Sequence, residues 1–170
     1  MKSIFLATLL LISLATFGQR KVEPTGTLRI YGKLKNELIF TTYNLDTFPT
    51  KAIDDIVVTN NHGETKKTVK GMKGFLLKDL LATADFQTAK PRELNEFYFV
   101  LIASDNYKVV FSWNEIFNTE IGNNLYVITE KEGKRIKEMD ERILVIATTD
   151  FKTGRRYIKG LDKIVVKRLD

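Results

Sequence analysis

The sequence contains no cysteine and only one histidine, His62, among its 170 residues. Without cysteine the chain can form no disulfide, no iron–sulfur cluster, no thiolate metal site and no cysteine nucleophile. A single histidine excludes a metal site built from several histidines, and a serine triad would have to depend on His62. No Gly-x-Ser-x-Gly sequence is present. These absences exclude the common cysteine- and histidine-based catalytic sites.

Long apolar runs are also scarce, and the one that exists lies at the start of the chain. The run from Ile4 to Phe17 follows a short basic start and precedes Gly18-Gln19. This layout predicts a signal peptide over residues 1–19, cleaved next to Gln19. The run is shorter than the roughly 20 residues of a spanning helix, so an uncleaved anchor is the weaker alternative. No cysteine follows the run for acylation, so we expect a periplasmic or secreted protein that is neither a lipoprotein nor membrane-spanning.

The chain has three prolines, no Pro/Gly/Ser-rich linker and no internal repeat. We therefore expect a short leader over residues 20–26 and a single domain over residues 27–170. A domain of this size buries roughly 68–70% of its unfolded surface and needs no disulfide. The net charge of +6 favours an anionic ligand, a membrane surface or nucleic acid. Because the lysines are dispersed and no nucleic-acid motif accompanies them, we expect no nucleic-acid partner.

Hydrophobic periodicity predicts an α+β fold with mostly antiparallel short strands and two or three short helices. The run 97–103 is continuously apolar, which predicts a strand covered on both faces. The leucines within 75–81 form one stripe of a helix. The other expected strands are 27–31, 37–40, 56–59, 67–69, 107–111, 125–129, 143–147 and 163–166, and the other expected helices lie within 41–48 and 115–117.

Four blocks of sequence stand out along the chain. One is the spacing Gly-x-Arg-x-Ile-Lys-x-Leu over Gly154–Leu161, followed by an apolar run. The others are the Gly-x-x-Leu-x-x-Leu-Leu pattern of 74–81, the hairpin sequence 103–107 and the strand 142–146. In this order the four blocks resemble the molybdopterin-binding domain of sulfite oxidases, from Leu28 almost to the end of the chain. The resemblance implies a sulfite-oxidase-like fold in which the late Arg and Lys hold the phosphate end of a pterin cofactor.

This sequence departs from that family at the metal. The family's molybdenum-binding cysteine falls in the loop before the Gly-x-x-Leu helix, where this chain has Thr59-Asn60-Asn61-His62-Gly63. Amide and imidazole groups are poor replacements for a soft thiolate. The chain is also far shorter than a sulfite oxidase, and we expect it to lack the second domain through which those enzymes dimerise. We therefore expect no cofactor, with molybdopterin as the alternative.

The basic segment supplies the first candidate binding residues, Arg155, Arg156 and Lys159. Guanidinium groups form forks that recognise phosphate or carboxylate, and lysine adds a point charge. In a strand, alternation would place Arg155 and Tyr157 on one face and Arg156 on the other, so all serve one site only if the segment is a loop. The alternative is a solvated edge with the charges outward.

Three further residues are candidates. Asn61 and His62 lie near the position that the resemblance gives to the family's cysteine, and a solvent-exposed turn is the competing interpretation. Tyr107 lies beside the hairpin turn at Asp105. We expect it either to form an aromatic wall of a ligand pocket or to be only part of the turn.

Together these features predict an exported, non-catalytic binding domain that holds a small anionic or pterin-like ligand or an envelope protein partner. A deep basic cleft would favour the ligand, and an exposed apolar patch around Phe40, Tyr43 and Phe48 would favour the partner. The alternative is a periplasmic molybdopterin-dependent oxidoreductase with a non-thiolate metal site.

Overall fold

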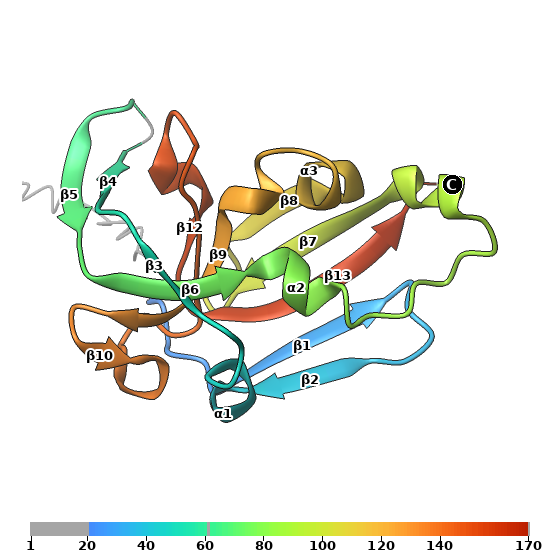
Figure 1. Cartoon of the computed structure of the whole chain (residues 1–170), viewed down its shortest axis with the longest axis horizontal. Coiled ribbons are helices and arrows are strands. Elements are labelled where there is room, and N and C mark those ends of the chain that lie inside the picture. The colour runs from blue at the N-terminus through green and yellow to red at the C-terminus, as the bar shows by residue number, and fades with distance from the viewer. Residues whose placement is uncertain (1–20, 61, 170) are drawn as a thin grey trace, which may run out of the picture.

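The computed structural model describes residues 21–60 and 62–169 (Figure 1). The expected signal peptide and the expected site residue Asn61 lie outside the described residues. The described part of the chain forms thirteen strands, three short α-helices and four 3₁₀ helices. Within it, no helix is long and apolar enough to cross a membrane.

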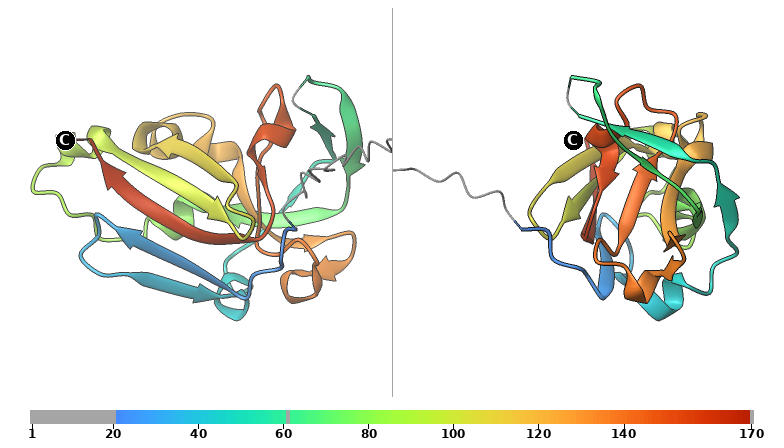
Figure 2. Two further views of the ribbon diagram at one scale, coloured as in Figure 1. Left: turned by 180° about the vertical axis from the view of Figure 1, so that it is seen from behind. Right: turned by 90° about the vertical axis from the view of Figure 1, so that its left-hand side faces the viewer.

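The first sheet has five strands, and both ends of the domain contribute to it (Figure 2). β1 pairs in parallel with β13, and every other pairing in the sheet is antiparallel. The mostly antiparallel α+β architecture expected from the sequence is therefore confirmed, with one parallel pair. In order across the sheet the strands are β2 (Leu38–Thr41), β1 (Thr27–Gly32), β13 (Leu161–Arg168), β7 (Phe97–Ala103) and β8 (Lys108–Ser112).

The second sheet is antiparallel and is built around β9, which pairs with three other strands. One hydrophobic core contains side chains from both larger sheets, including Phe75, Phe99 and Val127. The strands in order are β12 (Tyr157–Ile158), β11 (Leu144–Ala147), β9 (Leu125–Lys131), β6 (Met72–Leu76) and β3 (Lys51–Ile53), with β10 (Lys134–Arg135) also on β9.

Short helices join these strands, and two of them begin with a capping box. Thr41 caps α1 (Thr42–Leu45), and Ser112 caps α3 (Trp113–Phe117) through reciprocal bonds with Glu115. The remaining α-helix is α2 (Leu77–Leu81). The 3₁₀ helices are Pro91–Glu96, Gly122–Asn124, Ile136–Glu138 and Thr153–Arg156.

Two local expectations need correction. Phe75 and Leu76 belong to strand β6 rather than to the helix expected over 75–81, because β6 pairs with β9 and Phe75 stacks on Phe48 with ring centroids 4.4 Å apart. β7 is not fully covered on both faces. Its residues alternate between buried and half-buried, so only one face is wholly inside the core.

A separate two-stranded hairpin of β4 (Ile56–Thr59) and β5 (Thr65–Val69) stands at one end of the molecule. The segment that ends in β12 rises beside it (Figure 1). These two segments are far apart in sequence, and the space between them forms the candidate site.

Candidate functional site

A pocket of about 410 Å³ lies between the β4–β5 hairpin and the segment 153–159. Its size is within the range of about 300–1,000 Å³ that is common for small-molecule sites. The lining combines hydroxyl, amide and imidazole groups with three lysines. The lining residues are Val58, Thr59, Asn60, His62, Lys66, Lys67, Gly154, Tyr157 and Lys159.

The two walls are fastened together by Thr153 and Gly154. The Thr153 hydroxyl donates to the Val57 carbonyl at 2.7 Å and accepts from the Thr59 amide at 3.1 Å. Gly154 allows the close approach, since a Cβ on it would lie 1.9 Å from the Thr59 carbonyl oxygen. The distance between the walls is therefore set by direct main-chain packing.

The turn that carries His62 is held by Asn60. The Asn60 Oδ1 accepts from the main-chain amides of His62 at 2.9 Å and Glu64 at 3.0 Å. This pattern is an Asx-type turn, in which a side chain replaces a main-chain partner. It places His62 at the rim of the pocket.

A second hollow of about 260 Å³ adjoins the first and shares Gly154, Tyr157 and Lys159 with it. Tyr107 and Asp105 line its other side. The Tyr107 hydroxyl donates to the Arg155 carbonyl at 2.6 Å, which fixes the tyrosine against the basic segment. The two hollows thus lie on either side of Tyr157 and Lys159.

Positive charge dominates the first pocket. Lys66, Lys67 and Lys159 line it, and no carboxylate of the described residues does. The ammonium groups of Lys67 and Lys159 lie 5.6 and 5.7 Å from the centroid of the Tyr157 ring. Cations at this distance are attracted to the face of an aromatic ring. The pocket therefore suits an anion better than a cation.

Glu141 lies behind the pocket and binds its lysines. Its carboxylate forms ion pairs with Lys67, Lys131 and Lys159. Burial by itself raises the pKa of Glu141, but the hydrogen bonds from Lys131 and Lys159 outweigh it and lower the pKa to about 2. Glu141 is therefore a permanent negative charge at neutral pH.

The hydroxyl oxygens of two pocket residues, Thr59 and Tyr157, are buried, and that of Thr59 has no hydrogen-bond partner among the described residues. The Tyr157 side chain is only 7% exposed. Its burial chiefly raises the pKa of the hydroxyl, and the charges of Glu141 and Glu132 and a hydrogen bond to Glu141 raise it further. The phenol therefore stays protonated. An unsatisfied buried polar group costs about 1–3 kcal/mol.

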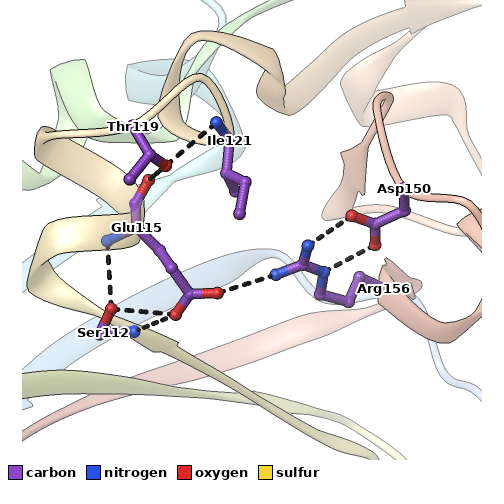
Figure 3. A network of polar contacts seen from close by, with 6 residues as sticks. All are labelled: Ser112, Glu115, Thr119, Ile121, Asp150 and Arg156. Carbon is purple, nitrogen blue, oxygen red and sulfur yellow. Dashed lines mark hydrogen bonds and ion pairs between the residues drawn. The ribbon is translucent and has the colours of Figure 1, made fainter.

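Arg156 does not line either hollow and is engaged elsewhere (Figure 3). Its guanidinium binds both oxygens of Asp150, with an Nε–Oδ2 distance of 2.6 Å, and contacts Glu115 at 3.4 Å. The same group lies over the Phe111 ring, 4.6 Å from its centroid. The pKa of Arg156 is raised, chiefly by its hydrogen bonds to the carboxylate of Asp150. Arg156 thus joins α3 to the segment after β11.

The structure brings together some of the residues expected from the sequence and separates others. His62 and Lys159 line the first pocket, and Tyr107 lines the second with Lys159. Arg155 contributes its main-chain carbonyl to Tyr107. Arg156 points into the Asp150–Glu115 network because the segment 153–156 is a 3₁₀ helix and not a strand.

Sequence reasoning missed Thr59, Lys66, Lys67, Tyr157 and Glu141. Tyr157 lies within the basic motif, and that position was the only feature of the sequence that could have indicated its place in the pocket. The lysines of β5 carry no local signal because lysines are dispersed along the chain.

The residues around the pocket do not fit a molybdenum centre. The loop at the position of the family's cysteine does line the pocket, but it offers hydroxyl, amide and imidazole groups. In the described part of the chain, no group of three or more His, Asp or Glu side chains could hold a metal ion. The neighbouring lysines would also repel a cation.

Comparison with known proteins supports the fold alone. No protein-family model matches the chain, and no curated protein matches its sequence. Among solved structures, the sulfane dehydrogenase SoxCD from Paracoccus pantotrophus is similar, with a TM-score of 0.60 and 16% sequence identity. The match covers 84% of this chain and 39% of the SoxCD chain, so this chain spans well under half of that protein's length. The likeness supports a sulfite-oxidase-like fold.

Proposed function

We propose that this protein is a non-catalytic binding domain that holds a small anionic or pterin-like ligand in the pocket between β4–β5 and β12. The observation that carries the proposal is a pocket lined by Lys66, Lys67 and Lys159, with the amide of Asn60 and the imidazole of His62 beside them. Lysine ammonium groups supply the countercharge of an anionic oxygen, and amide and imidazole groups can donate hydrogen bonds to it.

The apolar start of the chain supports the further proposal that the domain acts in the periplasm or after secretion. We infer a ligand rather than a protein partner because the aromatic residues near β2 do not form an exposed patch. Phe48 stacks on Phe75 and meets Phe40 edge-on, and of the three aromatics considered there only Tyr43 is exposed, at 74%. In addition to Tyr43, Ile39 of β2 is exposed at 61%, so a partner would find two exposed apolar side chains there rather than the expected aromatic patch.

The oxidoreductase alternative would require a metal site without a thiolate. The pocket supplies lysines where such a site needs anionic or neutral donors. The SoxCD likeness bears on the fold alone.

Titration calorimetry of the purified protein with inorganic phosphate, sulfate and 6-carboxypterin tests the proposal. We expect at least one of these anions to bind, and Lys67→Met and Lys159→Met each to weaken it about tenfold, the size of a charged hydrogen bond. Lys73→Met is the matched control, since Lys73 pairs with Glu130 at 3.0 Å and does not line the pocket. Equal binding by all three variants, or no binding by the unmodified protein, would contradict the proposal.

A further inference from the structure

Three lysines converge on one half-buried carboxylate, that of Glu141. Lys67 approaches Glu141 Oε1 at 3.6 Å, Lys159 binds the same oxygen, and Lys131 binds Oε2. The Glu141 side chain is 18% exposed. A carboxylate with this many partners is satisfied on both oxygens.

Glu141 reaches the pocket's lysines from the opposite side. Lys67 and Lys159 line the ligand pocket, whereas Glu141 and Lys131 line a different hollow of about 290 Å³. The ammonium groups of Lys67 and Lys159 also lie near the Tyr157 ring. These two pocket lysines are therefore already paired with an internal anion.

The three ion pairs differ in how readily they can be given up. The Lys67 pair is the longest, and the Lys67 side chain is 44% exposed, against 34% for Lys159 and 13% for Lys131. An exposed, long ion pair contributes little, so Lys67 can turn to another anion at small cost. Lys131 stays with Glu141, which avoids leaving a buried charge uncompensated.

We infer that Glu141 is an internal competitor for the ligand: its carboxylate occupies Lys67 and Lys159 in the unliganded protein, and the ligand is an organic oxyanion that takes over these two ammonium groups. This inference rests on the proposed function. A group that replaces a carboxylate on two lysines must present anionic oxygens, which selects carboxylates, phosphate esters and sulfates. The volume of about 410 Å³ leaves room for an organic body beyond the anionic group. Because its pKa lies near 2, Glu141 competes as an anion at every pH at which binding would be measured.

The test compares Glu141→Gln with Glu132→Gln in calorimetric titrations of inorganic phosphate and 6-carboxypterin. Glu132 lines the same rear hollow and influences Tyr157, but it forms no ion pair within the described residues. We expect Glu141→Gln to bind the anion about tenfold more tightly than the unmodified protein, and Glu132→Gln less than about threefold more tightly. The control removes the same charge from the same neighbourhood, so it separates contact from general electrostatics.

Glu141→Asp is the second variant. It keeps the charge but shortens the side chain, which withdraws the carboxylate from Lys67 and Lys159. We expect tighter anion binding here too, and thermal unfolding of each variant shows whether it is folded. Glu141→Gln binding no more tightly than the unmodified protein, or no more tightly than Glu132→Gln, overturns the inference while the proposed function stands. If neither the unmodified protein nor Glu141→Gln binds any probe, both are overturned.

Discussion

Arg156 and Glu141 show that the role of a charged side chain in this molecule depends on its partners. Arg156 looks like a ligand-binding residue in the sequence motif, yet its fork is filled by Asp150 and its face lies on Phe111. Glu141 belongs to no motif, yet it contacts both pocket lysines. The chemistry of a charged residue is thus decided by the partners that surround it.

The pH dependence of stability provides a test at the scale of single residues. The pKa of Glu141 falls from 4.5 to about 2 in the folded protein, so the folded state favours the ionised form. This contribution is fully present above pH 4.5 and is lost as the pH falls toward 2, and a shift of this size corresponds to about 3 kcal/mol at most. We expect Glu141→Gln to flatten the fall in unfolding free energy between these pH values.

Urea unfolding followed by fluorescence at a series of pH values measures this effect. Glu37→Gln is the comparison, because the pKa of Glu37 is also lowered, chiefly by its hydrogen bond from Arg29, but the pair is exposed. The effect of that variant should be small, since exposed ion pairs contribute little. Parallel stability curves for Glu141→Gln and the unmodified protein would contradict the assignment.

At the scale of secondary-structure elements, the site depends on how the β4–β5 hairpin packs against the 3₁₀ helix of residues Thr153–Arg156. The hairpin has no other sheet partner among the described strands. Two hydrogen bonds of the Thr153 hydroxyl and the close approach of Gly154 hold it in place. The pocket therefore exists only while this contact is made.

Gly154→Ala should weaken both stability and anion binding. The new Cβ would lie 1.9 Å from the Thr59 carbonyl oxygen and 3.1 Å from its carbon, so the hairpin must move away. We expect a loss of about 1–3 kcal/mol in unfolding free energy, as for other overpacked sites, together with weaker binding of the anion. Denaturant unfolding and calorimetric titration measure the two effects.

Gly26→Ala is the matched control, because no atom lies within 4 Å of the Cβ it would add. It should leave both stability and affinity nearly unchanged. A Gly154→Ala variant that binds and unfolds like the Gly26→Ala variant would show that the close approach is not needed.

At the scale of the whole molecule, the fold resembles that of a known protein, whereas the side chains at the candidate site are this chain's own. The likeness to SoxCD extends over 84% of this chain at 16% identity, so the arrangement of strands is shared while most side chains differ. A fold carries no function by itself, since activity depends on the groups at the site. Here those groups are lysines and hydroxyls without a thiolate.

Metal and pterin content tests this separation. We expect the full chain, expressed with export in a host that makes molybdenum cofactor, to contain far less than stoichiometric molybdenum. Elemental mass spectrometry and acid release of fluorescent pterin measure the two components. Near-stoichiometric molybdenum with pterin would contradict the proposed function and favour the oxidoreductase alternative. Pterin without metal would identify the ligand as pterin-like.

Local sequence pattern was sufficient for most of the strands, since alternation and apolar runs are properties of consecutive residues. The runs at 27–31, 56–59, 97–103 and 125–129 all lie in strands. Several strand ends differ from the pattern by one or two residues, and the largest error is at 75–76, because the pairing of β6 with β9 extends the strand through Phe75 and Leu76. Long-range pairing decided a position at which local preference favoured a helix.

The sequence by itself determined that no thiolate metal site or disulfide can form, because those require cysteine. It also placed Lys159 and His62 among the candidate residues. Only the tertiary structure decided that Lys67, Glu141 and Lys159 meet, and that Arg156 turns to Asp150. The ion pair of Lys67 with Glu141 forms because a hairpin packs against a 3₁₀ helix roughly ninety residues further along the chain. Arg156 reaches Asp150 because residues 153–156 form that 3₁₀ helix rather than a strand. No local periodicity encodes such a long-range contact, since it depends on the packing of the whole domain.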